Sequence, residues 1–116
     1  MTVYVDHAGY RYGRMRMCHM LADSDAELHA MADMIGVARR WWQSPDTTAG
    51  SHYDICLAKR TVALRLGAQP VTTRQLAAMN ARRRETGALG APETALAWLK
   101  MYRATPRRER DLALAR

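Results

Sequence analysis

The first part of the chain alternates apolar and polar positions in the way that is typical of strands. Thr2–Asp6 (TVYVD) is a β-branched and aromatic run that ends in a carboxylate, and it predicts a buried strand. His7–Gly13 contains two glycines and predicts a loop. Met15–Ala22 alternates again and predicts a second strand. One face of this strand carries Met15, Met17, His19 and Leu21, and the other carries Arg16, Cys18, Met20 and Ala22.

The pattern next changes to the period of a helix. Ser24 is followed three residues later by Glu27, a capping-box pair that satisfies the free amides at a helix start. Gly36 suits the left-handed position just after the end of a helix. The apolar stripe between these signals consists of Leu28, Met31, Ala32 and Ile35.

Two further capping pairs predict two further helices. Ser51 with Asp54 opens a helix that ends at a glycine and has an apolar stripe of Ile55, Ala58, Val62 and Leu66. Thr72 with Gln75 opens another helix, which runs to about Arg83.

Shorter segments complete the pattern. Arg39–Gln43 (RRWWQ) predicts a third strand, and Ala68–Val71, which contains a proline, predicts an edge strand. Pro92 suits the first turn of a last helix that follows a glycine-rich hinge. Beyond Pro106 the sequence is compatible both with a helix and with an irregular tail.

The order of these elements indicates the class of the fold. Strands that alternate with capped helices predict an α/β protein with a small sheet of three or four mostly parallel strands, flanked by helices. Two parts are expected: an α/β domain over residues 1–84 that carries the site, and a basic helical C-terminal extension over residues 85–116.

The composition narrows the class of protein. With 48% hydrophobic and 25% charged residues, a chain disordered over its whole length is not expected. No apolar run reaches the roughly 18 residues of a membrane span, and the N-terminus lacks a secretory pattern. Two cysteines, Cys18 and Cys56, favour free thiols in a reducing, cytoplasmic setting over a disulfide framework.

The formal net charge of +7 is concentrated near the C-terminus. Residues 1–80 hold 9 Lys and Arg against 7 Asp and Glu, whereas residues 81–116 hold 9 against 4. Such a basic extension can attract nucleic acid or another polyanion. A solvated surface that keeps the protein soluble explains the same charges equally well.

If the strands are parallel, their carboxyl ends meet at one edge of the sheet, where helix N-termini also point. Asp6, Asp23, Gln43 and Ser51–Asp54 would then converge. We therefore expect a site at this edge.

Several distinctive blocks follow one another over about residues 1–80: MTVYVD, YGRMRMCHMLAD, ELHAMADMIG, ARRWWQ, SHYDICLAKR and GAQPVTTRQLA. In this order the blocks resemble a small family of phage and bacterial proteins of unknown function. The family pattern falls on Tyr12, Gly13, Arg14, Met17, Cys18, His19, Asp23, His29, Trp41, Gln43, His52, Tyr53, Asp54 and Lys59. The resemblance implies no established activity.

Basic and aromatic side chains in these blocks suit a phosphate-bearing ligand, a nucleotide or a nucleic acid. Cations near helix N-termini favour phosphate, and aromatic rings can stack a base. The expected ligand-binding residues are Tyr12, Arg14, Trp41, Gln43, Tyr53 and Asp54. Alternate arginines on a strand also arise simply because one face is solvated.

A catalytic set is available beside them. His19 and His52 can divide the roles of general base and general acid at a phosphodiester, with Lys59 nearby and Asp23 at the strand end. No metal ion is needed in this mechanism. A histidine on an apolar strand face is equally well explained as a hydrogen-bonded core residue.

A metal-dependent mechanism is the alternative. Asp6, Asp23 and Asp54 at successive strand ends could hold Mg²⁺ or Mn²⁺. A zinc set of Cys18, His19, His52 and Cys56 lacks any recognised ligand spacing, so no zinc site is expected. The sequence also lacks a P-loop, a dinucleotide-binding glycine pattern and an HExxH motif.

Three classes of function stay open. The first is binding of a phosphate-bearing ligand together with phosphodiester hydrolysis, and the second is a non-catalytic nucleotide- or nucleic-acid-binding module of a phage. The third is a protein-interaction protein without a small-molecule site, in which Trp41 and Trp42 lie on the face of a homodimer. Whether the protein is an enzyme is not decided by the sequence.

Overall fold

A six-stranded sheet forms the centre of the protein. The computed structural model describes residues 2–46, 48 and 50–114. The strands are β1 (Val3–Val5), β2 (Tyr10–Tyr12), β3 (Met15–Ala22), β4 (Trp42–Gln43), β5 (His52–Cys56) and β6 (Gln69–Pro70). The helices are α1 (Asp25–Ile35), α2 (Leu57–Arg65), α3 (Thr73–Thr86), α4 (Pro92–Ala104) and α5 (Arg107–Leu114), with a short 3₁₀ helix, η1, at Arg39–Trp41.

The sheet is mostly antiparallel, and the prediction of a mostly parallel sheet of three or four strands is wrong. Its order is β4-β5-β3-β1-β6, and β2 pairs separately with β3. The long strand β3 is antiparallel to β1, β2 and β5, and the one parallel pair in the described part of the chain is β1 with β6. The connections between β1, β2 and β3 are too short for the crossover that parallel neighbours need. Therefore β1 and β2 each pair antiparallel with β3. The coarser prediction of an α/β protein is confirmed.

Part of the predicted loop His7–Gly13 is the strand β2. Tyr10 lies opposite Met17 and Tyr12 lies opposite Met15. Gly13 makes the turn into β3 with a φ of 61°, in the left-handed region that glycine adopts easily. Both tyrosines therefore lie on the same face of the sheet as His19.

The segment predicted as the start of the second helix is also a strand. In β5, Tyr53 and Ile55 are buried while His52, Asp54 and Cys56 alternate with them on the opposite face. The helix α2 begins only at Leu57. The strand is favoured because it buries two large apolar side chains in the core.

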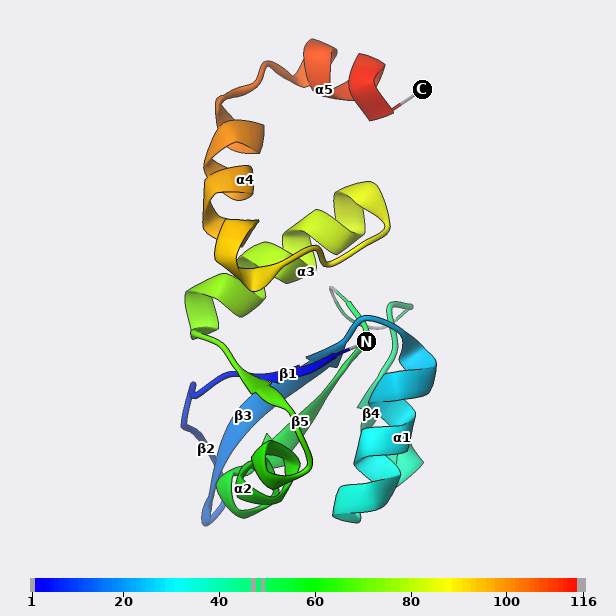
Figure 1. Ribbon diagram of the computed structural model, residues 1–116, viewed down its shortest axis with the longest axis vertical. Helices are drawn as coiled ribbons and strands as arrows, with labels where there is room; N and C mark the ends of the chain where they lie inside the picture. Colours follow the sequence, from blue (N-terminus) through cyan, green and yellow to red (C-terminus); the bar gives the residue numbers. More distant parts are fainter. Residues whose placement is uncertain (1, 47, 49, 115–116) are drawn as a thin grey trace.

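Helices cover both faces of the sheet (Figure 1). On one face α1 and α2 pack on the sheet, and the buried side chains are Val3, Val5, Cys18, Met20, Ala22, Leu28, Met31, Ala32, Ile35, Tyr53, Ile55, Ala63 and Ala68. On the other face α3 and α4 build a second core of Tyr4, Leu21, Val71, Leu76, Ala78, Met79, Leu89 and Ala95. Both thiols, Cys18 and Cys56, are free, as expected.

The helix α3 leaves part of the second face uncovered. We call this part the open face; it carries Met15, Met17, His19, Asp54 and Cys56. The alternation predicted for β3 is confirmed here, because Cys18, Met20 and Ala22 are buried on the opposite face while Met15 is exposed. The alternation thus places His19 where a ligand could reach it.

The predicted helix ends are confirmed at three places. Ser24 Oγ accepts a hydrogen bond from the Glu27 amide, Thr72 and Gln75 form a complete capping box, and Pro92 lies in the first turn of α4. The segment after Pro106 is the helix α5, and residues 115–116 lie outside the described part. In the described part of the chain no helix has both the length and the apolar character that a membrane span requires.

Candidate functional site

Four polar side chains from three strands meet on the open face. Asp6 follows β1, His19 lies on β3, and His52 and Asp54 lie on β5. His19 lies directly opposite Asp54 in the β3–β5 ladder, and the rings of His19 and His52 are 6.0 Å apart. We call these four residues the polar cluster.

Asp6 and His19 form a buried hydrogen-bonded pair. The Asp6 carboxylate is fully buried; it accepts from His19 Nδ1 at 2.8 Å, from the His19 amide at 2.8 Å and from the Ala8 amide at 3.4 Å. Burial opposes ionisation, but these hydrogen bonds outweigh it and lower the pKa of Asp6. The bond to Asp6 raises the pKa of His19 despite partial burial. His19 is therefore fixed with Nδ1 toward Asp6 and Nε2 toward Asp54.

Asp54 lies between the two imidazoles. Its Oδ1 is 3.8 Å from His19 Nε2 and 3.4 Å from His52 Nε2, and Oδ2 accepts a hydrogen bond from Gln43 Nε2. Burial opposes the charge of Asp54, but His52 and Gln43 outweigh it and lower the pKa of this carboxyl. Oδ1 is nevertheless buried without a hydrogen-bond partner. A buried carboxylate oxygen in this state attracts a proton or a cation.

His52 is oriented by the backbone. Its Nδ1 lies 2.7 Å from the Gly50 carbonyl oxygen, which can only accept a hydrogen bond, so Nδ1 carries the proton. The loop that supplies this carbonyl is held by α3, because Arg83 donates to the Ser51 carbonyl at 2.9 Å. As in His19, Nε2 is the nitrogen that faces Asp54.

A cavity of about 500 Å³ lies beside the cluster. We call it the aromatic cavity; its lining includes Tyr10, Tyr12, Met15, Met17, Arg40, Trp41, Gln43, Asp54, Cys56 and Lys59. Asp54 belongs both to this lining and to the polar cluster. A second cavity of about 240 Å³ lies between the cluster and α3 and is lined by His19, Leu21, His52, Thr73, Leu76, Ala77 and Asn80. The cluster can therefore be approached from two sides.

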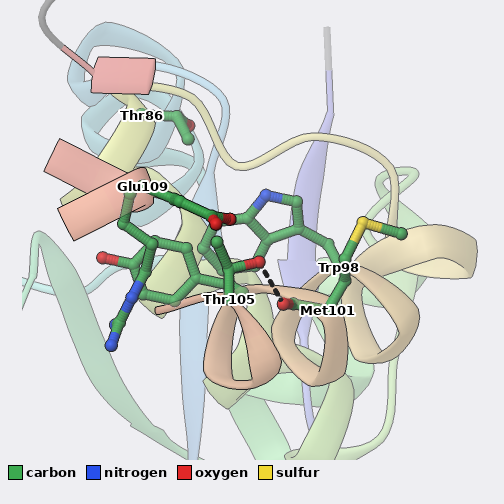
Figure 2. Close-up of a pocket in the computed structure, with 7 residues that line it drawn as sticks. Thr86, Trp98, Met101, Thr105 and Glu109 are labelled. Carbon is green, nitrogen blue, oxygen red and sulfur yellow. Dashed lines mark hydrogen bonds between the residues drawn. The ribbon is translucent and has the colours of Figure 1, made fainter. Parts of the chain in front are cut away.

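A third hollow, of about 280 Å³, lies in the C-terminal helices (Figure 2). Figure 2 shows Trp98, Met101 and Thr105 gathered there, with Thr105 Oγ1 donating to the Met101 carbonyl at 2.8 Å. Its aromatic rings are already in contact with cations of the same chain, since Arg82 lies over Trp98 and Arg110 lies over Tyr102. It lacks the paired imidazoles and carboxylates of the polar cluster, so we take the open face as the candidate site.

Residues 3–83 match the protein family described as "Protein of unknown function (DUF4031)". The chain belongs to this family. The resemblance seen in the sequence is thereby confirmed for a family of unknown function. A search of curated proteins and a search of solved structures found no match.

The family match contains the whole polar cluster and the aromatic cavity, whereas α4 and α5 lie beyond it. The candidate site is thus part of the family's domain.

Most residues expected from the sequence are brought together. Those in the cluster or the aromatic cavity are His19, His52, Asp54, Tyr12, Trp41, Gln43 and Lys59. Arg14 lies at the exposed hairpin turn and does not line that cavity.

Two expected residues lie elsewhere. Asp23 stands beyond the far end of β3, where its carboxylate accepts from the Thr2 amide at 2.9 Å and from the Tyr4 hydroxyl at 3.3 Å. Tyr53 is fully buried on the opposite face, and its hydroxyl is 2.7 Å from His29 Nδ1. In the structure both residues make hydrogen bonds that stabilise the fold.

The sequence reasoning missed three contributors. It treated Asp6 only as a metal ligand at a strand end, although the carboxylate orients His19. It placed Tyr10 in a loop, whereas the hairpin brings its ring within 5.3 Å of the His19 ring. It gave Arg40 no role, although this residue lines the aromatic cavity. An alternating YRYGRMRM pattern around a glycine was the available signal for the hairpin.

The metal sets drawn from the sequence are not assembled. Asp23 is separated from Asp6 and Asp54 as described, and Cys18 lies on the opposite face from His19 and His52. Within residues 2–46, 48 and 50–114, no three or more His, Cys, Asp and Glu side chains are closed around a point that could hold a metal ion.

Proposed function

We propose that this protein binds a phosphate-bearing ligand, a nucleotide or a nucleic acid, in the aromatic cavity. The observation that carries the proposal is the lining: three aromatic rings, Tyr10, Tyr12 and Trp41, stand with two cations, Arg40 and Lys59, around about 500 Å³. Rings can stack a base, and cations attract phosphate.

The aromatic side chains are accessible. Tyr12 is 60% exposed and Trp41 is 53% exposed, which is unusual for large rings that serve only the core. Arg40 lies over the Trp41 ring at 5.4 Å, so a guanidinium and an indole already form one surface. A base stacked on Trp41 would bring its phosphate within reach of Arg40.

The start of α2 supplies further attraction for an anion. Cys56 precedes this helix and lines the cavity, and it makes no side-chain hydrogen bond to the first-turn amides. Lys59 stands in that first turn. Free amides, the positive end of the helix and the ammonium group all favour phosphate at this wall.

Hydrolysis of a phosphodiester is the second candidate function, and the polar cluster favours it. Asp54 joins the cavity to His19 and His52, so the groups needed to activate a water molecule lie beside the proposed phosphate position. Asp54 replaces Asp23 in this proposal, because Asp23 hydrogen-bonds elsewhere.

Calorimetric titration with inorganic phosphate, AMP, ATP, a cyclic nucleotide, and short RNA and DNA single strands tests the binding proposal. We expect saturable binding of at least one nucleotide-containing ligand. Lys59→Ala should weaken it roughly tenfold or more, as loss of one charged hydrogen bond does. Lys100→Ala is the matched control, because Lys59 and Lys100 are the two lysines of the sequence and Lys100 is exposed on α4.

The outcomes separate the classes of function. Equal affinities of the Lys59→Ala and Lys100→Ala variants would contradict binding in the aromatic cavity. Turnover that disappears in His19→Ala and His52→Ala supports hydrolysis, and saturable binding without turnover selects a binding module. No binding of any ligand leaves a protein-interaction role.

A further inference from the structure

The unpaired oxygen of Asp54 faces two nitrogens that also carry lone pairs. His52 Nδ1 donates to the Gly50 carbonyl, and His19 Nδ1 donates to the Asp6 carboxylate. In the neutral ring each Nε2 is then an acceptor. When both rings are neutral, three electron-pair donors therefore converge: Nε2 of His19, Nε2 of His52 and Oδ1 of Asp54, which has no hydrogen-bond partner. The Tyr10 hydroxyl is a further neighbour that hydrogen-bonds to the Asp54 carboxylate.

This arrangement has the outer contacts of a metal site. Histidines that bind a metal ion almost always donate their second ring nitrogen to a carboxylate or a backbone carbonyl, which fixes the ring. Asp6 and the Gly50 carbonyl have these two roles here. Gln43 likewise holds the second oxygen of Asp54.

The separations are close to those of a metal shell. Ligand atoms about 2.1 Å from a tetrahedral zinc ion are about 3.4 Å from each other. The two Nε2–Oδ1 separations are 3.4 and 3.8 Å. The side chains are not yet closed around one point. Binding of an ion would require the imidazole rings to move from 6.0 Å toward about 5 Å.

The geometry points to a site for one divalent transition-metal ion, of which zinc best suits the donor set, bound by His19 Nε2, His52 Nε2 and Asp54 Oδ1. Two imidazoles and one carboxylate leave a fourth position open, as in catalytic rather than structural zinc sites. This inference deepens the hydrolysis part of the proposed function, since a bound ion lowers the pKa of its water and attracts phosphate. Binding of the ion itself needs no phosphate ligand.

Titration of chelator-treated, tag-free protein with zinc chloride, followed by calorimetry, tests the site. We expect one ion per chain, and a rise in the thermal unfolding midpoint when zinc is added. His19→Gln, His52→Gln and Asp54→Asn should each weaken binding at least about tenfold, and Asp6→Asn should weaken it roughly 10- to 100-fold through the outer contact. Circular dichroism shows whether each variant remains folded.

Two controls separate this site from other zinc-binding groups. His7→Gln removes an exposed histidine outside the cluster, and Met34→Leu changes an exposed apolar side chain on α1 that lies in neither the cluster nor the aromatic cavity. Both variants should bind zinc as the wild type does. Absence of zinc binding by the wild type, or equal binding by the folded His52→Gln variant, would overturn the inference.

The proposal of a metal site and the proposal of a phosphate-bearing ligand can be tested independently. Zinc binding without nucleotide binding keeps the metal site and removes the proposed function. Nucleotide turnover that persists at an unchanged rate in excess EDTA excludes a metal ion from the hydrolysis, overturns that part of the inference and leaves the two imidazoles as general base and acid.

Discussion

At the scale of single residues, the polar cluster explains why a carboxylate can lie inside this small protein. Asp6 is fully buried but accepts hydrogen bonds from the His19 ring and from two amides. A buried charge without such partners would cost several kcal/mol. His19 therefore stabilises the fold and remains available, through Nε2, to a ligand.

The Asp6–His19 pair predicts a pH dependence of stability. Because the pKa of His19 is raised in the folded protein, the charged imidazole stabilises the fold. This contribution to the free energy of unfolding is complete below about pH 6.5 and is lost as pH rises through the raised pKa. The lowered pKa of Asp6 means that its contribution is present above about pH 3.9 and is lost on acidification. The pair thus contributes most between these limits.

His19→Gln should therefore reduce the free energy of unfolding more at about pH 5.5 than at about pH 9. Urea unfolding at both pH values measures the two differences. His7→Gln, the same substitution at an exposed histidine outside the polar cluster, is the control with which both differences are compared. An equal effect of His19→Gln at both pH values would refute the assignment of the charged pair.

Tyr53 is expected to act through the fold alone. Tyr53→Phe removes the hydroxyl that meets His29 Nδ1 and should lower the free energy of unfolding by about 1 kcal/mol. Nucleotide affinity should stay within about twofold of the wild type, because the side chain is buried on the opposite face. Urea unfolding measures the change in stability, and calorimetry measures the nucleotide affinity. A large loss of affinity would show that Tyr53 contributes to ligand binding after all.

At the scale of elements, α3 positions the site from outside the sheet. Arg83 on α3 bonds both the Ser51 carbonyl and Asn80 Oδ1, each at 2.9 Å. Gly50 is packed so closely on this helix that a Cβ there would overlap the Asn80 side chain. The carbonyl of Gly50 is the group that orients His52.

Gly50→Ala should displace this loop from α3. We expect a loss of roughly 1–3 kcal/mol in the free energy of unfolding and about tenfold weaker zinc binding, because His52 loses its orienting carbonyl. Urea unfolding and zinc calorimetry measure these effects. Adding Asn80→Ala should recover part of the loss by removing the overlap. A Gly50→Ala variant that binds zinc like the wild type would contradict the role of α3.

The elements that the sequence predicts correctly are those marked by local sequence patterns, such as a helix cap or an alternation of apolar and polar residues. The capped helices α1 and α3 and the alternating strand β3 carry such signals, and so does the assignment of His19 to one face of β3. The strand β5 was predicted wrongly because Ser51 and Asp54 imitate a helix cap. In the structure Ser51 Oγ donates to Asp25 and accepts from the Trp42 indole.

The pairing of strands could not be predicted from such signals. His19 and Asp54 are 35 positions apart and meet only because β3 pairs with β5. Asp6 reaches His19 through the pairing of β1 with β3. The residues of the site could therefore be named from the sequence, but their partners depend on register, which the sheet as a whole decides.

At the scale of the whole molecule, the protein is elongated, with extents of 45, 26 and 23 Å. Helices α3 to α5 form one end of it and α1 and α2 the other (Figure 1). The exposed cations of the C-terminal end include Lys100, Arg103, Arg107 and Arg108. This end can attract a polyanion without contributing to the open face.

A nucleic-acid ligand would therefore be attracted by the charge of α5. Arg107→Glu with Arg108→Glu should weaken binding of single-stranded RNA and lower the slope of log affinity against log salt by about 0.7 for each phosphate that is no longer neutralised. Arg65→Glu with Arg74→Glu is the control with the same change in net charge, on α2 and α3. Titrations at several salt concentrations measure the slope. Equal slopes for the two double variants would assign α5 no specific role.

If a phosphate-bearing ligand occupies the aromatic cavity, as proposed, its location can be measured directly. Amide and indole nuclear magnetic resonance spectra of the isotope-labelled chain, recorded during titration with the tightest-binding nucleotide, report which residues meet the ligand. We expect shifts at the Trp41 indole and at the amides of Tyr10–Tyr12 and Cys56–Lys59. Shifts confined to α4 and α5, with the open face unchanged, would contradict it.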